Sequence, residues 1–264
     1  MRIVILISLL ASVLFACEET IDRRFFNDPP AKPVVEGMIT NQPGESYVKL
    51  SMAVRSPNDV PEKISGAYVA VTDGENTVVF GEAPGEKGLY LPENTIRAVV
   101  GKIYGIQIQI GEYSDSAYTY LTAVAPIGEF ITYPDASKAD YFFLAGSEND
   151  DPSMIRYQID PPGCTGDTSC RYVLYEYKLS SFDVPQIFSP TKETISFPLG
   201  SRVIRKKYSL NPGYESYIRA ILSETEWRGG LFDVQPGNAN GNFGISTLGY
   251  FSGCSLLIDT LYIE

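Results

Sequence analysis

The sequence predicts a mainly β protein with two β-sandwich-like units, of which the second also carries one amphipathic helix. Three observations predict this class. Short runs rich in β-branched and aromatic residues recur about every ten residues, turn residues separate these runs, and helical periodicity is found only once. The chain has 264 residues, 44% of them hydrophobic, so a packed core is expected for most of its length.

The N-terminal segment, residues 1–16, has the layout of a cleavable signal peptide. Arg2 supplies a positive charge, and the 14 residues that follow it up to Ala16 form an apolar run. A membrane-spanning helix needs about 20 apolar residues, so this run is too short to be an anchor by itself. The four residues 14–17, Leu-Phe-Ala-Cys, resemble a bacterial lipobox.

The lipobox resemblance implies that Cys17 is lipidated, with diacylglycerol on its sulfur and a further acyl chain on its amino group. Two or three long chains hold a protein to a membrane, whereas one binds only marginally. An ordinary cleaved signal peptide followed by a free cysteine is the alternative.

Residues 17–33 are expected to form a tether between the acylated cysteine and the folded part. Two glutamates follow the cysteine, and three prolines within residues 29–33 favour an extended, semi-rigid chain. In similar lipoproteins of Bacteroidota an acidic stretch at this position directs the protein to the cell surface. A solvated linker is the plainer interpretation.

Residues 34–125 are expected to form an immunoglobulin-like or transthyretin-like sandwich. A hairpin is predicted around Asp73–Asn76, where Gly74 can take a left-handed conformation. Isoleucine alternates with glutamine over residues 106–110, which predicts one buried and one wet face. The expected strands are residues 34–40, 47–53, 67–72, 77–80, 88–91, 104–110 and 117–123.

Residues 126–264 are expected to form the second β domain. A helix at about 212–228 is predicted from Asn211 as N-cap, Pro212 at the first helical position, and an apolar stripe that begins at Tyr214. The other stripe residues are Tyr217, Ile218, Ile221 and Leu222, and Gly229-Gly230 is the expected stop. The expected strands are residues 141–145, 154–160, 171–179, 194–198, 201–208, 247–251 and 256–263.

The order of these motifs resembles an uncharacterised Bacteroidota lipoprotein family, domain-of-unknown-function family 4249. The resemblance implies an outer-membrane location and a β fold, and it implies no reaction. Members are commonly considered alongside TonB-dependent outer-membrane receptors. The motifs that carry it are the lipobox, Val34–Thr40, Ser65–Val69 with its hairpin, Tyr208–Leu210, Tyr214–Tyr217, Phe232-Asp233 and Gly249–Gly253.

Three cysteines follow Cys17, and an exported protein meets an oxidising environment. Cys164 and Cys170 flank a short polar loop, so we expect a small disulfide there. Cys254 is then a buried free thiol, although its pairing with either loop cysteine is the alternative.

The composition excludes several classes of function. Without residues 1–16 the chain has 20 basic and 32 acidic side chains, a net charge of −12, so nucleic-acid binding is not expected. The chain has no histidine, which rules out Ser-His-Asp and Cys-His catalysis and His-containing zinc sites. No cofactor is therefore expected.

Residues 148–151, Glu-Asn-Asp-Asp, could offer oxygen ligands to calcium, but their spacing does not match an EF-hand and a solvated turn explains them equally well.

These observations lead to a non-enzymatic, lipid-anchored outer-membrane protein that faces the cell exterior. The leading hypothesis is an accessory subunit that binds an outer-membrane transporter or assembly. The alternative is a glycan- or peptide-binding module, which the 18 tyrosines and the Asn/Gly-rich loops favour. A hydrolase that uses carboxylates alone is the third hypothesis, and sequence cannot choose its two acids.

Overall fold

The computed structural model describes residues 31–54, 59–146, 151–164, 170–180, 195–226 and 239–264. The chain separates into Met1–Pro30 and Ala31–Glu264, and everything described below lies in the second unit. The described residues are mainly β, with 15 strands and one substantial helix.

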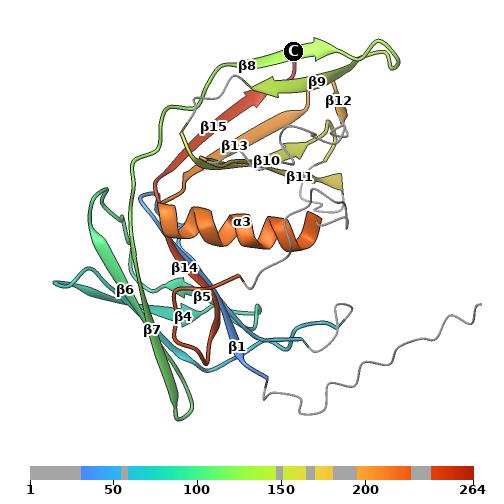
Figure 1. Ribbon diagram of the computed structural model, residues 1–264. Helices are drawn as coiled ribbons and strands as arrows, with labels where there is room; N and C mark the ends of the chain where they lie inside the picture. Colours follow the sequence, from blue (N-terminus) through green and yellow to red (C-terminus); the bar gives the residue numbers. More distant parts are fainter. Residues whose placement is uncertain (1–30, 55–58, 147–150, 165–169, 181–194, 227–238) are drawn as a thin grey trace, which may run out of the picture. The chain divides into compact units, whose positions relative to one another are not determined.

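The largest sheet has eight strands in the order β14-β1-β2-β5-β4-β3-β6-β7 (Figure 1). All neighbours pair antiparallel except β1 and β14, which are parallel. The strands are β1 (Pro33–Thr40), β2 (Tyr47–Met52), β3 (Tyr68–Thr72), β4 (Thr77–Glu82), β5 (Leu89–Pro92), β6 (Ile103–Ile110), β7 (Tyr113–Tyr120) and β14 (Leu248–Cys254).

This sheet curls until its two edges meet. The Gly253 amide on β14 donates to Thr119 Oγ1 on β7 at 2.9 Å, and Thr122 forms a β-bridge with Cys254. The sequence predicts two facing sheets for residues 34–125, and the structure has one curled sheet instead. The physical reason is that β14, near the end of the chain, pairs with β1 and completes the enclosure of the core. A strand from residues 126–264 thus belongs to the same sheet as residues 34–125, which the sequence assigns to a separate domain.

The inside of the curl holds the main hydrophobic core. Ile106 and Ile108 on β6 are buried, whereas the alternating Gln107 and Gln109 are exposed, as the alternation predicts. The other buried members are Val35, Ile39, Val48, Leu50, Ile64, Val69, Val71, Phe80, Tyr90, Ala98, Tyr104, Ala117, Leu121 and Phe251. One face of β3, β6 and β7 is thus committed to the core, and the opposite face is open.

Two smaller sheets contain the seven remaining described strands. One has the order β11-β10-β13-β15 and the other β12-β9-β8. A core between them includes Ile159, Phe197, Val203 and Ile263. Their strands are β8 (Phe130–Pro134), β9 (Tyr141–Gly146), β10 (Ser153–Asp160), β11 (Tyr172–Lys178), β12 (Ser196–Pro198), β13 (Arg202–Ser209) and β15 (Leu256–Tyr262). The sequence does not predict β8, because proline and glycine surround it.

The helix α3 (Pro212–Glu226) lies between the curled sheet and the four-stranded sheet. Asn211 caps it as predicted, since its Oδ1 accepts from the Tyr214 amide at 3.0 Å. Ile218 packs with Met38 of β1 and Leu256 of β15. The expected Gly229-Gly230 stop lies outside the described residues. In the part of the chain that the structure describes, no helix is both long and apolar enough to cross a membrane.

Candidate functional site

The predicted covalent sites have different outcomes. Cys17 lies outside the described residues. Cys164 and Cys170 form a disulfide with their Cα atoms 5.9 Å apart. Cys254 is a free cysteine with no exposed surface, and burial raises the pKa of its thiol to about 12 although a hydrogen bond with Ser252 opposes the shift.

The calcium hypothesis concerns residues of which only one is described. Residues 148–150 lie outside the described residues. The Asp151 carboxylate accepts from Lys207 Nζ at 3.0 Å and from the Ala125 amide at 3.0 Å, so both its oxygens already have partners. Among the described residues, no group of three or more His, Cys, Asp or Glu side chains could hold a metal ion.

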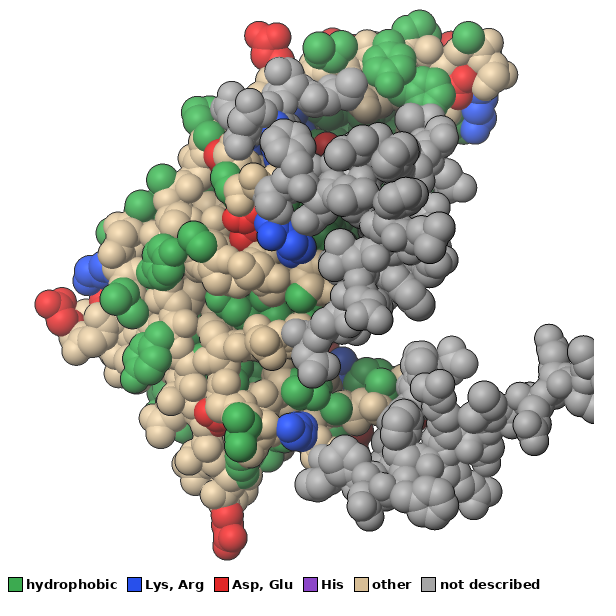
Figure 2. Space-filling view, in the orientation of Figure 1, with side chains coloured by type: hydrophobic (Ala, Val, Ile, Leu, Met, Phe, Trp, Pro, Cys, Tyr) green, Lys and Arg blue, Asp and Glu red, His purple; other side chains and the backbone are tan. Residues whose placement is uncertain are grey.

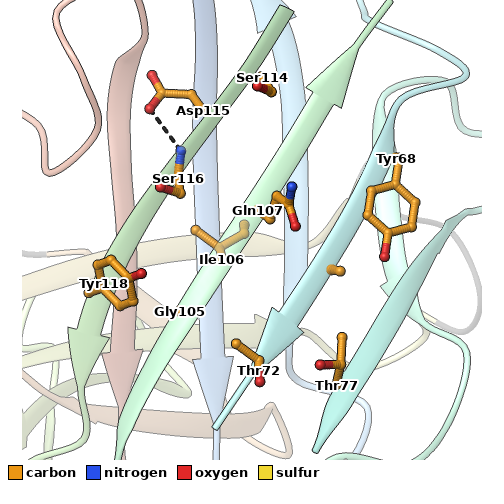
Figure 3. A pocket seen from close by; sticks show the side chains of 11 residues that line it. Tyr68, Thr72, Thr77, Gly105, Ile106, Gln107, Ser114, Asp115, Ser116 and Tyr118 are labelled. Carbon is orange, nitrogen blue, oxygen red and sulfur yellow. Dashed lines mark hydrogen bonds between the residues drawn. The ribbon is translucent and has the colours of Figure 1, made fainter. Parts of the chain in front are cut away.

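The best candidate site is a groove on the open face of β3, β6 and β7, with a volume of about 480 Å³. Figure 3 shows Tyr68 from β3 and Tyr118 from β7 on opposite sides of it, with Gln107 from β6 between them. Both tyrosines are solvent-accessible, with exposed fractions of 45% and 69%. We call this feature the tyrosine groove; its further lining residues are Ala70, Thr72, Thr77, Gly105, Ile106, Ser114, Asp115 and Ser116.

A glycine determines where the Tyr118 ring lies. Gly105 is the cross-strand partner of Tyr118. A Cβ atom on Gly105 would lie 2.9 Å from Tyr118 Cε1 and 3.2 Å from Cδ1, closer than real Cβ contacts. The ring can therefore lie across β6 only because residue 105 has no side chain.

Between the two tyrosines the lining of the groove is mostly polar. Its neutral polar side chains are four hydroxyls and one amide, from Thr72, Thr77, Ser114, Ser116 and Gln107, and Ala70 and Ile106 are its apolar side chains. Asp115 is the one charged residue among those that line the groove, and its carboxylate is engaged elsewhere. Asp115 Oδ2 accepts from Thr247 Oγ1 at 2.6 Å and from Tyr113 Oη at 2.9 Å. Burial raises the pKa of Asp115, but these hydrogen bonds outweigh burial and lower it below its usual value.

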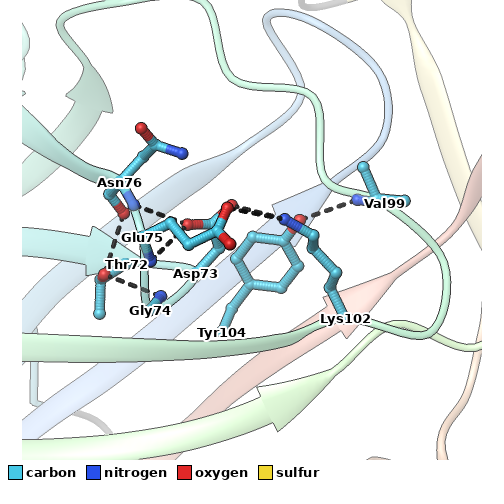
Figure 4. Close-up of polar contacts among 8 residues, drawn as sticks. All are labelled: Thr72, Asp73, Gly74, Glu75, Asn76, Val99, Lys102 and Tyr104. Atoms are coloured by element: carbon cyan, nitrogen blue, oxygen red, sulfur yellow. Dashed lines mark hydrogen bonds and ion pairs between the residues drawn. The ribbon is translucent and has the colours of Figure 1, made fainter.

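The end of the groove near Thr72 and Thr77 is held by the β3–β4 hairpin (Figure 4). Asp73 Oδ1 accepts from the Asn76 amide at 2.8 Å and the Glu75 amide at 3.1 Å. Lys102 Nζ donates to Asp73 Oδ2 at 3.1 Å, which joins the turn to the loop before β6. Hydrogen bonds from the Asn76 amide and from Lys102 lower the pKa of Asp73 to about 2. The hairpin is therefore fixed before any ligand arrives.

This arrangement suits binding better than reaction. Aromatic rings and neutral hydrogen-bonding groups face the groove, and the engaged Asp115 carboxylate is the only titratable acid in its lining. The sequence indicates the wet face of residues 106–110 but not the groove itself. Tyr68 and Tyr118 come from strands that flank β6, and in sequence both are indistinguishable from ordinary cross-strand tyrosines.

Comparison with protein families identifies the family of this chain. A family model described as "Domain of unknown function (DUF4249)" matches residues 19–256. No curated protein matches the chain. Because the match extends from the residues just after the predicted lipidation site into β15, this chain belongs to the DUF4249 family.

Proposed function

We propose that this chain is a non-enzymatic lipoprotein, anchored in the outer membrane through acyl chains on Cys17, whose tyrosine groove binds a neutral, hydroxyl-rich ligand such as a glycan. The observation that carries this proposal is a groove between two exposed tyrosines, lined mostly by neutral polar side chains and by no Lys or Arg, in a protein of net charge −11. An acidic surface repels anionic ligands, and the groove lining has no basic side chain to attract them.

The chemistry of the groove fits a sugar chain. A sugar ring has an apolar face of C–H groups, which can lie against the Tyr118 ring, and a rim of hydroxyls. Gln107 and the serine and threonine hydroxyls supply both donors and acceptors to that rim. Tyr68 is opposite Gln109 on β6 and Tyr118 is opposite Gly105. The two tyrosines are thus staggered along β6, which favours an extended ligand over a single sugar. Peptides are the less favoured ligand because the one charged side chain of the groove, Asp115, is already hydrogen-bonded to Thr247 and Tyr113 and the lining has no Lys or Arg to orient a chain.

The binding test compares two exposed tyrosines. The full chain is titrated with neutral oligosaccharides that score on a glycan array. Tyr118→Ala should weaken binding at least about tenfold, a loss of about 1.4 kcal/mol. Tyr262→Ala removes a tyrosine that is 60% exposed on β15 and should leave the affinity unchanged. The absence of any glycan binding, or an equal loss in both variants, would contradict the proposed ligand.

The anchor is tested separately from the groove. Cys17→Ser should release the protein from the membrane fraction, because no acyl chain can then be attached. Protease treatment of intact cells should digest the wild-type chain if it faces the exterior. A Cys17→Ser protein that stays fully in the membrane fraction would count against lipidation at this residue.

A second candidate function is that of an accessory subunit of an outer-membrane transporter or assembly. The favouring observation is the apolar outer face of the three-stranded sheet. Phe130, Phe142 and Leu144 of this sheet pack inward, so Ile131, Tyr133 and Phe143 lie on its other face. Ile131 is 51% and Tyr133 44% exposed, and Figure 2 shows apolar side chains gathered where β8 and β9 lie. Exposed apolar patches of this kind mark protein interfaces.

This candidate is tested by copurification from detergent-solubilised membranes. The wild-type chain should bring down an outer-membrane protein, and Ile131→Asp should abolish the copurification. Tyr118→Ala, in the tyrosine groove, should leave it intact. Recovery of the chain alone would contradict an accessory role.

A further inference from the structure

Two arginines meet one buried aspartate at the end of β10, beside the disulfide. Asp160 is 5% exposed. Its Oδ1 accepts from Arg171 Nε at 2.6 Å, and its Oδ2 accepts from Arg202 Nη2 at 2.5 Å and Nε at 3.2 Å. Burial raises the pKa of this carboxyl group, but the hydrogen bonds from Arg202 and Arg171 outweigh burial and lower it. Asp160 is therefore ionised at neutral pH and fixes both guanidinium groups in place.

The same residues open onto a hollow of about 380 Å³. The Arg202 side chain is 45% exposed and the Arg171 side chain 27%. Each guanidinium has five N–H donors, and Asp160 takes one from Arg171 and two from Arg202. Both arginines thus keep N–H groups that can reach a ligand. The other lining residues are Pro161, Gly163, Cys164 and Gly200.

The local covalent structure positions Arg171. It follows Cys170 directly, and the disulfide ties Cys170 to Cys164. The turn before the disulfide is closed by the Cys164 amide, which donates to the Pro161 carbonyl at 3.0 Å. The backbone that carries Arg171 is therefore tied to the end of β10, where Asp160 lies.

We propose that this hollow binds a singly charged oxyanion group, a carboxylate or a phosphodiester, held by Arg171 and Arg202. Among the described residues that line the hollow, two guanidinium charges and one carboxylate leave a net charge of +1, which a monoanion neutralises. Planar guanidinium groups form paired hydrogen bonds with the oxygens of such anions, and Asp160 has already oriented them. This site is separate from the tyrosine groove, which lies on the eight-stranded sheet and has no basic side chain in its lining.

The test follows the arginines directly. The full chain in detergent solution, labelled with ¹⁵N-arginine, is titrated with sodium acetate and, in parallel, with sodium dimethyl phosphate. Sodium chloride keeps the ionic strength constant. The Nε–Hε signals of Arg171 and Arg202 should shift and saturate with a dissociation constant on the order of 1 mM. Saturation by only one of the two anions identifies which oxyanion the hollow takes.

Two variants test whether the guanidinium geometry is required. Arg202→Lys keeps the charge but loses the paired donors, and it should weaken binding at least about tenfold. Arg97→Lys changes an exposed arginine on another loop and should bind like the wild type. Thermal unfolding confirms that each variant is folded. Signals in the wild type that respond to neither anion, or that respond equally to chloride, would overturn the proposal.

Discussion

The curled eight-stranded sheet and the four-stranded sheet β11-β10-β13-β15 bury very different side chains. Inside the curl, the core cluster consists of apolar residues together with Tyr90 and Tyr104. In the four-stranded sheet, Asp160, Arg205 and Lys207 are each 5% exposed or less. The first region gains stability from apolar burial, which depends little on pH. The second depends on charges that are stable in the interior only while they are paired.

The largest expected effect tests the apolar side of this comparison. Phe251 on β14 has no exposed surface and packs in the main core. Phe251→Ala should lower the free energy of unfolding by about 3–5 kcal/mol, because it leaves a cavity where an aromatic ring was. Urea unfolding measures this change. Leu248→Ala on the same strand, where the side chain is 42% exposed, should lower the free energy of unfolding by less than about 1 kcal/mol. Equal losses in the two variants would show that the burial of Phe251 in the core does not stabilise the fold.

The next effect tests the charged side. Lys207 is completely buried, and its Nζ lies 3.0 Å from Asp151 Oδ1. Asp151→Asn preserves the shape of the side chain but removes the charge opposite a buried ammonium, so it should cost about 3 kcal/mol. Glu36→Gln removes a partner from the exposed pair with Lys49 and should change stability by less than about 1 kcal/mol. A near-neutral Asp151→Asn would show that buried charge does not govern this region.

The two regions should also separate in their response to acid. The pKa of Asp160 is lowered below its ordinary value of 3.8 by Arg202 and Arg171 despite the opposing effect of burial. Its contribution to stability is therefore complete above that value and is lost as the pH falls through the folded-state pKa. Asp160→Asn should cost about 2 kcal/mol at pH 7 and should flatten the loss of stability between pH 7 and acid. Unfolding curves with the wild-type acid dependence would contradict this role.

The smallest effect on stability concerns the tyrosine groove. Gly105→Ala places a methyl group against the Tyr118 ring, which can move outward because it is exposed. The cost should stay below about 1 kcal/mol. In the wild type, NMR should show ring-current shifts of the Gly105 Hα protons, and Gly105→Ala should reduce the corresponding shift. Unchanged ring-current shifts would mean that the glycine does not set the ring position.

Local features of the fold are predictable from the sequence because neighbouring residues carry them. The hairpin at Asp73–Asn76, the Asn211 cap and the alternation over residues 106–110 are all confirmed. The pairing of distant strands, in contrast, is not predictable from local sequence. β1 and β14 pair although more than 200 residues separate them, and no local pattern in either strand specifies the other. The expectation of two facing sheets failed for this reason.

The candidate sites are less predictable from the sequence than these local features. The run Arg205-Lys206-Lys207 has the composition of a solvated edge, yet Arg205 and Lys207 are buried because β13 lies in the middle of the four-stranded sheet. Asp160, Arg171 and Arg202 come from three separate segments that only the sheet brings together. The predicted disulfide is the exception, since a six-residue separation keeps its two cysteines close in any fold.

The position of β1 has a mechanical consequence for a protein tethered at its N-terminus. β1 begins at Pro33, the last residue of the predicted tether, and it has β14 on one side and β2 on the other. Both ladders run along the same stretch, from Val34 opposite Leu248 and Ser51 to Met38 opposite Ser252 and Tyr47. A force applied at Pro33 along the axis of β1 would load the hydrogen bonds of both ladders together in shear. A strand whose hydrogen bonds are pulled at right angles to its axis would instead lose them one by one. With the proposed anchor at Cys17, this arrangement would let the protein bear drag without losing its first strand.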